Sequence, residues 1–351
     1  MDHLTPDPDL YNVPWAVEAF NSMPWRLLGR SGLRVSSVGL GTWKFGYPET
    51  GDDSRVAEKE AMAILDRAVE LGVTHWDTAN RYNNASGNSE RILGKWLKAN
   101  PDQRRNLTLA TKIFGGMDGR SPNHCRLSRL NVIESTYASM ERLQIDAIDV
   151  MYFHAYDPHT PITESLEAIE DLMRQDLVRY LAVSNFGVEQ LEAYEAAAGS
   201  LSGRVRVHAV QNGYDILSGE RPAMAGTLDY CARTGISFVA FSPLARGLLT
   251  NRYLDPRRAA SGDRLFDEGT LQADLGPETL ERLRALAAIA ADSELTVSQL
   301  VLAYMLATPG MGPVIPAAST IAQLEENARA GTVEMEKQQI ERVRRAVGNE
   351  Q

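Results

Sequence analysis

Four polar side chains that could transfer a proton stand at the ends of three consecutive apolar segments. Asp77 lies near the end of the run THWDTA, and Tyr82 follows that run. Lys112 lies near the end of LTLATKI, and His154 follows AIDVMYF. A buried ammonium group costs several kcal/mol unless it is paired, so Lys112 needs an anion, and Asp77 is the natural candidate. The cation would lower the pKa of a neighbouring tyrosine, and a histidine could orient a carbonyl or share the proton. The set predicts that Tyr82 donates a proton to a carbonyl oxygen.

Each of these residues also has a structural interpretation, which is favoured for any one of them alone. A lysine at a strand end usually extends to solvent, an aspartate in Asp-Thr-Ala often caps a helix, and a tyrosine or histidine usually packs. Their joint placement at the ends of three successive segments favours chemistry instead.

Short β-rich runs alternate with helical patterns from about residue 37 onward, as in repeated βα units around a parallel sheet. Eight such runs predict an α/β fold, a closed (β/α)8 TIM barrel with its active site at the carboxyl ends of the strands. The stretch WRLLGRSGLRVS ahead of them predicts a β-hairpin that caps the barrel bottom. We therefore expect an N-terminal extension over 1–24 and one barrel domain over 25–351. The runs lie at 38–41, 74–79, 107–113, 147–153, 178–184, 207–212, 237–244 and 313–318.

The helical patterns between these runs have one apolar face each. One carries Ala61, Ile64, Leu65, Ala68 and Leu71 and stops at Gly72. A second starts at Thr160 and Pro161, and a third begins with the capping-box pair Thr296 and Gln299. The segment 245–277 is too long for an ordinary connection and is expected to be functional or disordered.

Composition limits the function classes. The 351 residues are 44% hydrophobic and carry a formal net charge of -10, so a nucleic-acid partner is not expected. Cys125 and Cys231 lack disulfide or zinc-site spacing and are interpreted as buried thiols. The N-terminal region has no basic start and the chain has no long apolar stretch, so we expect a cytoplasmic protein without a membrane partner.

A proton donor alone reduces nothing, and a hydride source is needed. The sequence GLGTWKFG is not a G-x-G-x-x-G fingerprint, so a nucleotide would bind by another route. The loops after strands seven and eight of a barrel often hold phosphate, which indicates 243–247 and 315–327. Ser184, Asn185 and Gln211 at strand ends could grip a carboxamide, and Tyr214 could stack on a flat ring. For each alone, a role in a turn is the favoured interpretation.

The chain resembles the aldo-keto reductases over nearly its whole length. The matching motifs are WRLLGRSGLRVSSVGLGT, DTANRY, LATKIF, YFHAYDP, VSNF, VQNGY, FSPLARGLL, IPAAS and QLEEN. The resemblance implies a (β/α)8 barrel that binds NADP(H) in preference to NAD(H), with Asp77, Tyr82, Lys112 and His154 as the catalytic tetrad. Hydride would pass from the nicotinamide to the carbonyl carbon while Tyr82, its pKa lowered by Lys112 with Asp77, protonates the oxygen. Members that act as potassium-channel β subunits lack the histidine, so His154 favours catalysis over regulation.

The resemblance also implies a set of cofactor-binding residues. These are Ser184, Asn185 and Gln211 for the carboxamide, Tyr214 for the ring, and Gly41, Thr42 and Trp43 near the ribose and substrate. The pyrophosphate would lie at Ser242, Leu244, Arg246 and Gly247, and the 2′-phosphate and adenine at Ser319, Gln323, Glu326 and Asn327. The chain departs from the family pattern at Asn83, Ala182 and Ala317, where glycine is usual, and at 175–176, where Gln-Asp replaces a Gly-Lys turn. A methyl group at Ala317 could crowd the turn beside the phosphate.

The expected activity is nicotinamide-dependent reduction of aldehydes, ketones or open-chain sugars, with a small carbonyl compound as partner. The alternatives are an NADP(H)-sensing regulatory subunit with negligible turnover, and a sugar or polyol dehydrogenase that works in the oxidative direction. Trp43, Tyr47, Phe114 and Phe153 are candidates for the pocket wall. A homo-oligomer is possible. Tyr11, Trp15, Phe20 and Trp25 of the aromatic N-terminal region are expected to close the barrel bottom or to cover a neighbouring subunit.

Overall fold

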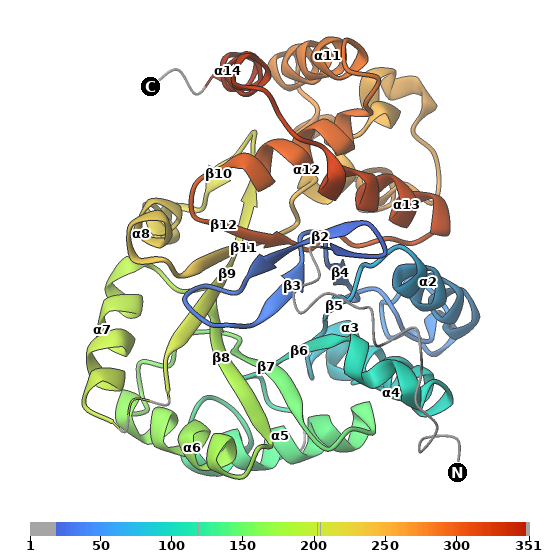
Figure 1. Ribbon diagram of the computed structural model, residues 1–351. Coiled ribbons are helices and arrows are strands. Elements are labelled where there is room, and N and C mark those ends of the chain that lie inside the picture. The colour runs from blue at the N-terminus through green and yellow to red at the C-terminus, as the bar shows by residue number, and fades with distance from the viewer. Residues whose placement is uncertain (1–18, 118, 202, 204, 349–351) are drawn as a thin grey trace, which may run out of the picture.

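The structure is a computed structural model that describes residues 19–348 except 118, 202 and 204. In this part of the chain eight parallel strands lie side by side in a curled sheet (Figure 1). Their order follows the sequence, as repeated βα units require. They are β4 (Leu40–Gly41), β5 (His75–Asp77), β6 (Thr108–Ile113), β7 (Ile148–Phe153), β8 (Val178–Ser184), β9 (Val207–Asp215), β11 (Ser237–Phe241) and β12 (Met311–Val314).

The first and last strands close the sheet into a barrel. Parallel bridges join Val38 to Val314 and Gly41 to Ala317. The Gly39 amide donates to the Val314 carbonyl oxygen at 2.8 Å, and the Gly41 amide donates to that of Pro316 at 3.1 Å. The predicted (β/α)8 barrel is therefore confirmed. The two closing strands are shorter than predicted because part of their pairing consists of isolated bridges.

A helix follows each barrel strand, and these helices form the outer ring (Figure 1). The helix after β4 ends at Gly72, whose φ of 72° suits a glycine stop, and Thr296 and Gln299 form the predicted capping box. The ring consists of α2 (Glu58–Glu70), α4 (Asn88–Ala99), α5 (Arg129–Leu143), α6 (Ile162–Arg174), α7 (Val188–Gly199), α8 (Thr227–Thr234), α12 (Val297–Ala307) and α13 (Ile321–Arg329). Two further helices, α11 (Pro277–Ala291) and α14 (Lys337–Ala346), lie outside it.

Alternation along the strands divides the apolar side chains into two layers. The large layer lies between the sheet and its helices and contains Trp76 and Phe153. The small layer fills the barrel interior and contains Val150, Tyr152 and Ala182. The interior layer supports the strand ends from below, so residues at those ends are held on a packed base.

The predicted hairpin closes the barrel bottom. Strands β1 (Ala19–Phe20), β2 (Met23–Leu27) and β3 (Arg34–Ser36) pair antiparallel in front of the barrel in Figure 1. Leu28 and Val35 pack into the interior layer, and the Gly29 amide donates to Ser237 Oγ at 2.7 Å. Gly29 has a φ of 57°, and a Cβ atom there would lie 2.1 Å from the His208 carbonyl oxygen, so this turn needs glycine.

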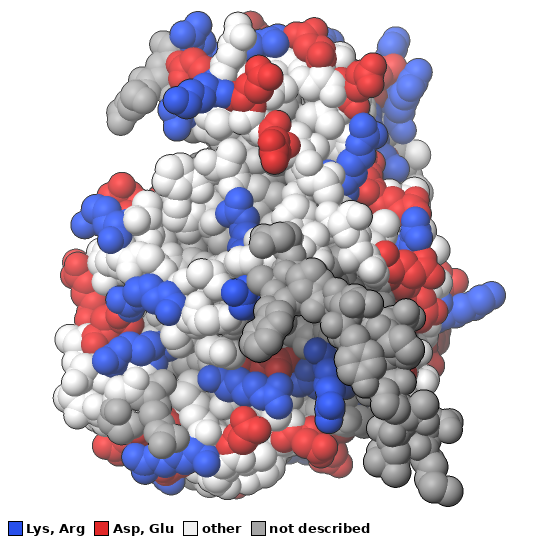
Figure 2. All heavy atoms as spheres, in the orientation of Figure 1, with Lys and Arg blue, Asp and Glu red and all other residues white. Residues whose placement is uncertain are grey.

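The surface shows mixed charge. On the face drawn in Figure 2, Lys and Arg side chains alternate with Asp and Glu side chains. Cys231 is buried as predicted, but Cys125 is partly exposed. Tyr11 and Trp15 lie outside the described residues. Among those that are described, no helix is long and apolar enough to cross a membrane.

Candidate active site

The proton-transfer residues come together at the carboxyl ends of β5, β6 and β7. The Lys112 ammonium donates to Asp77 Oδ1 at 2.5 Å, to the Thr78 carbonyl oxygen at 2.8 Å and to Tyr82 Oη at 2.9 Å. These bonds occupy all three of its N–H groups. The tetrad predicted from the sequence is therefore assembled, with the ammonium between the carboxylate and the phenol.

Burial and charge set the protonation states of the site. Burial lowers the pKa of Lys112, while Asp77 opposes this effect. Burial and the negative charge of Asp77 raise the pKa of Tyr82 well above its ordinary value. The predicted lowering of the Tyr82 pKa is thus wrong for this structure, because burial and the carboxylate disfavour the phenolate. Tyr82 is held as a neutral hydroxyl that can donate a proton.

His154 faces Tyr82 across the site. Its ring centroid lies 6.1 Å from that of Tyr82, at an interplanar angle of 76°. Burial, together with the positive charges of Lys112 and Arg81, lowers the pKa of His154 to about 3. The imidazole is therefore neutral near pH 7 and can donate or accept a hydrogen bond without adding charge.

Polar residues at and just after the end of β8 and within β9 join the same network. Gln211 Nε2 donates to Asp77 Oδ2 at 2.8 Å. Asn185 Nδ2 donates to the His154 carbonyl oxygen at 2.9 Å, and Ser184 Oγ donates to the Gln211 carbonyl oxygen at 2.8 Å. The three residues predicted to hold a carboxamide are thus fixed beside the tetrad.

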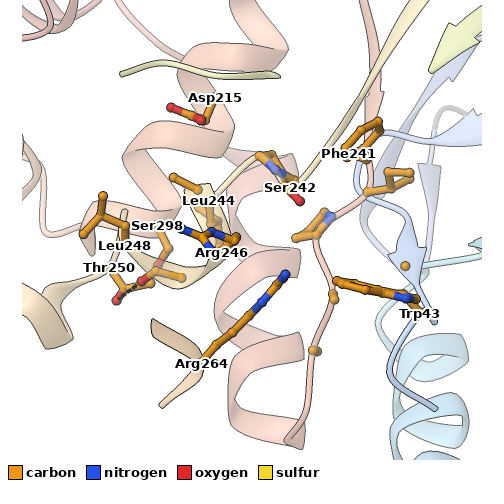
Figure 3. Close-up of a pocket in the computed structure, with 18 of the residues that line it drawn as sticks. Trp43, Asp215, Phe241, Ser242, Leu244, Arg246, Leu248, Thr250, Arg264 and Ser298 are labelled. Carbon is orange, nitrogen blue, oxygen red and sulfur yellow. Dashed lines mark hydrogen bonds between the residues drawn. The ribbon is translucent and has the colours of Figure 1, made fainter. Parts of the chain in front are cut away.

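A long cleft of about 1580 Å³ extends from the tetrad across the top of the barrel. Asp77, Tyr82 and His154 lie along it, whereas Lys112 is buried beneath. Figure 3 shows Leu244, Arg246 and Leu248 of the loop after β11 together with Ser298 of α12 on one side, and Phe241 and Trp43 on the other. The predicted residues that line it are Gly41, Trp43, Ser184, Asn185, Gln211, Tyr214, Ser242, Leu244, Arg246, Gly247, Ser319, Gln323, Glu326 and Asn327.

The long segment after β11 covers part of this cleft. It is ordered into short helices, including α9 (Arg264–Asp267) and α10 (Leu271–Asp274), so the functional interpretation of its length is favoured. The Arg264 guanidinium lies 4.8 Å from the Trp43 ring centroid, which brings the segment to the opposite wall (Figure 3). Arg246 pairs with Glu268 at 2.9 Å and also with Asp274. Two arginines therefore face the region where a pyrophosphate was predicted.

The far end of the cleft lies at the start of α13. Gln323 Oε1 accepts hydrogen bonds from the Ser319 amide and hydroxyl, both at 2.8 Å. Glu326 accepts one from Thr296 at 2.7 Å, and Asn327 donates to the Ala317 carbonyl oxygen at 3.5 Å. Ser319 and Gln323 lie at the helix N-terminus, which suits an anion, and Glu326 and Asn327 follow further along α13 on the cleft side.

Backbone strain is concentrated along the cleft. Asn185, Ser242, Ala245 and Arg246 have φ values of 58°, 56°, 47° and 59°. Residues other than glycine seldom adopt this left-handed conformation, and it is found most often where a site requires it. The turns after β8 and β11 are thus shaped for the cleft at some cost in stability.

Four predictions about individual side chains need correction. Thr42 is fully buried, and its hydroxyl donates to the Asp77 carbonyl oxygen at 2.9 Å, so it supports β5 and does not line the cleft. Tyr47 bonds Glu58 at 2.5 Å, and Phe153 points to the outer layer against Tyr194. Neither lines the cleft, and nor does Phe114. The strands that these side chains follow or end were identified correctly, but the direction in which the side chains point was not.

Sequence reasoning missed one ring beside the tetrad. Phe241 ends β11, is partly buried against the barrel interior and lines the cleft (Figure 3). The Arg221 guanidinium lies 5.3 Å from its ring centroid. Tyr214 lies at the cleft margin, and its ring packs edge-on against Phe238 at 5.8 Å. Alternation in SFVAF, which places Val239 and Phe241 on one face, was the available signal.

The departures from the family pattern are explained in part. Asn83 has a φ of 56°, which asparagine tolerates, and its amide donates to the Phe45 carbonyl oxygen at 2.7 Å. Asp176 likewise adopts a positive φ of 56° after α6. Ala317 is exposed and is not among the residues with positive φ, so its methyl group meets no strain. Ala182 is buried opposite Tyr152 in the barrel interior.

Comparison with known proteins decides the family. The model of the aldo/keto reductase family matches residues 37–347, which span the barrel and every cleft residue named above. The chain belongs to the aldo/keto reductase family. An aldo-keto reductase, str7 of Strobilurus tenacellus, is 32% identical over 329 residues, which cover 92% of this chain and 91% of that protein.

Other relatives of this chain are described as channel subunits. A probable voltage-gated potassium channel subunit beta of Arabidopsis thaliana is 31% identical over 313 residues, covering 88% of this chain and 91% of the relative. A protein of Schizosaccharomyces pombe described as a putative voltage-gated potassium channel subunit beta is 32% identical over 314 residues, which cover 88% of each chain. Membership of the family supports an oxidoreductase that acts on carbonyl compounds in general, and its relatives include channel subunits.

Proposed function

We propose that this protein reduces aldehydes or ketones to alcohols with a nicotinamide cofactor, and that Tyr82 is the general acid. The observation that carries the proposal is the bonding of Tyr82 Oη by the Lys112 ammonium at 2.9 Å at the inner end of the cleft. A neutral phenol in contact with a cation can give up its proton and remain stabilised as the anion. The cleft leaves space for a carbonyl oxygen beside it.

The other tetrad members have distinct roles in this proposal. Asp77 holds Lys112, which stabilises the phenolate left after proton transfer. His154, neutral near pH 7, orients the carbonyl oxygen toward Tyr82. Tyr82 would give its proton to the carbonyl oxygen as a hydride reached the carbonyl carbon, so that an aldehyde would become an alcohol; the hydride would come from a bound nicotinamide.

The residues along the cleft fit an extended dinucleotide. The nicotinamide supplies the hydride, and Ser184, Asn185 and Gln211 would hold its carboxamide. Phe241 is better placed than Tyr214 to face the ring, because it packs against the barrel interior at the cleft. Arg246 and Arg264 would receive the phosphates. We propose NADP(H) in preference to NAD(H), since an added phosphate would meet the polar surface at Ser319 and Gln323.

A direct test compares wild type with Tyr82→Phe in the oxidation of NADPH by a panel of aldehydes, ketones and sugars. We expect kcat to fall by about 10² to 10⁴ in the variant, the usual contribution of a positioned acid, while cofactor binding is retained. Running the panel with NADH in parallel tests the cofactor preference. An inactive wild type, or full turnover in Tyr82→Phe, would refute the proposal.

The channel-subunit relatives favour a second candidate, a regulatory protein that binds NADP(H) with negligible turnover. It would show tight cofactor binding, no measurable reduction of any carbonyl and a membrane-protein partner on purification. The neutral His154 beside Tyr82 supports catalysis as the first choice. Sugar or polyol oxidation uses the same site and would appear as faster oxidation than reduction at neutral pH. We further propose a small carbonyl substrate without a nucleic-acid partner, a cytoplasmic location and a possible homo-oligomer.

A further inference from the structure

A second tyrosine lies beneath the tetrad, and no role has been assigned to it above. Tyr152 is 0% exposed and projects from β7 into the barrel interior, in register with Lys112 on the neighbouring strand. Its ring centroid lies 5.4 Å from the Lys112 Nζ atom, and the ring centroid of Tyr82 lies 5.1 Å from the same atom. The ammonium group is therefore close to two aromatic rings, one at the cleft and one inside the barrel.

The hydroxyl of Tyr152 does not account for its presence. No hydrogen-bond partner for this buried oxygen occurs among the described residues, although the Gln211 amide lies near it. An unpaired buried hydroxyl is unfavourable, and a leucine or phenylalanine would avoid that cost. The opposite residue, Ala182, is small and belongs to the same interior layer, so the ring has room directly beside Lys112.

We propose that Tyr152 is a positioning residue for the acid site and that its ring keeps the Lys112 ammonium charged from inside the barrel. A cation within about 6 Å of a ring centroid is attracted by the electron-rich face, most strongly where water is excluded. Lys112 is 1% exposed, so the attraction is not weakened by solvent. The charged lysine in turn lowers the cost of the Tyr82 phenolate. This inference rests on the proposed carbonyl reduction.

Other groups also face Lys112, and the test must separate them from Tyr152. Burial opposes the charge, whereas Asp77 and Glu90 favour it. Besides Tyr152, the groups around the ammonium are Asp77 and His75 on β5, the Tyr82 hydroxyl at α3 (Tyr82–Ala85), Glu90 on α4, and His154 directly after β7. Each of these groups is retained when only residue 152 is changed.

The experiment measures kcat/KM for carbonyl reduction by the full chain with NADPH from pH 6 to pH 11. In the plot of kcat/KM against pH, the alkaline limb is the region where activity falls as the pH rises. Removing the ring in Tyr152→Leu should shift this limb to a pH about one unit lower, which corresponds to about 1.4 kcal/mol. Activity should then fall about tenfold above the limb and change little near pH 6.5. Tyr152→Phe keeps the ring and should retain the wild-type limb. Phe153→Leu is the matched control, since it removes a buried ring one residue away on the outer face.

A second series does not depend on the folding of the leucine variant. Phenylalanine analogues with increasing fluorination at position 152 keep the shape of the ring and weaken its attraction for a cation. The limb should move down stepwise along this series. An unchanged limb in the series, or a leucine variant that only loses rate at every pH, would overturn the inference while leaving the proposed function intact. An inactive wild type would instead refute the proposed function.

Discussion

Replacing His75 by phenylalanine should make the protein more resistant to acid. His75 is 0% exposed below the Asp77 and Lys112 pair, and neither ring nitrogen has a hydrogen-bond partner among the described residues. Burial lowers its pKa from 6.5 to about 4. The unfolded chain therefore binds more protons than the folded one as the pH falls through this interval, so stability is lost on acidification.

The size of this effect follows from the two pKa values. A difference of 2.5 units corresponds to about 3.4 kcal/mol when the pH lies below both values. At pH 4.5 the loss relative to pH 7.5 is about 2.5 kcal/mol, because His75 is by then charged in the unfolded chain and mostly neutral in the folded one. Phenylalanine has a similar volume and no proton to bind, so His75→Phe should lack this part of the loss.

Urea unfolding at pH 7.5 and pH 4.5 measures the difference. The loss of unfolding free energy between the two pH values should be smaller in His75→Phe than in wild type by about 2 to 3 kcal/mol. His159→Phe is the matched control, because this exposed histidine lies on the surface and should leave the loss unchanged. An equal loss in wild type and His75→Phe would show that His75 does not pay a burial cost on protonation, and the reasoning would be refuted.

Two further substitutions test the core of the site and the barrel bottom. Lys112→Met leaves the Asp77 carboxylate buried without its cation and should destabilise the protein by about 3 to 5 kcal/mol in urea unfolding, whereas Lys112→Met with Asp77→Asn should recover most of that loss. A double variant no more stable than the single one would contradict this. Gly29→Ala places a Cβ atom against the His208 carbonyl oxygen in a left-handed turn and should cost about 2 to 4 kcal/mol in the same measurement. Gly32→Ala, which meets no atom within 4 Å, should change stability by less than about 0.5 kcal/mol, and equal effects at the two glycines would argue against the close approach.

The barrel and the tetrad were predictable because they depend on pattern. Alternation and strand order alone bring Asp77, Lys112 and His154 to one end of a parallel sheet. The direction of single side chains beyond the strand ends was not predictable in this way. Thr42 turns inward to bond the Asp77 backbone, and Phe153 turns outward to Tyr194, because local packing decides these positions.

The charge state of Tyr82 also depended on burial that the sequence does not show. Proximity to Lys112 predicted a lowered pKa, but the phenol shares its enclosure with Asp77, and burial penalises the anion further. The ring of Phe241 was missed for a related reason. Its strand was identified, yet only the closed barrel shows that the inward face of β11 opens onto the cleft.

The raised pKa of Tyr82 is compatible with its proposed role as an acid. At rest, Lys112 and Asp77 form a buried ion pair, and Tyr82 and His154 are neutral, so the tetrad carries no net charge. A phenol that ionised at rest would have no proton to give. In the proposed reduction, hydride addition would turn the carbonyl oxygen into an alkoxide, which is a far stronger base than a phenolate and would take the Tyr82 proton. An anion formed on Tyr82 Oη in that step would meet the Lys112 ammonium, which lies 2.9 Å away. Gln211 donates to the other oxygen of Asp77 and draws part of the carboxylate charge away from the phenol.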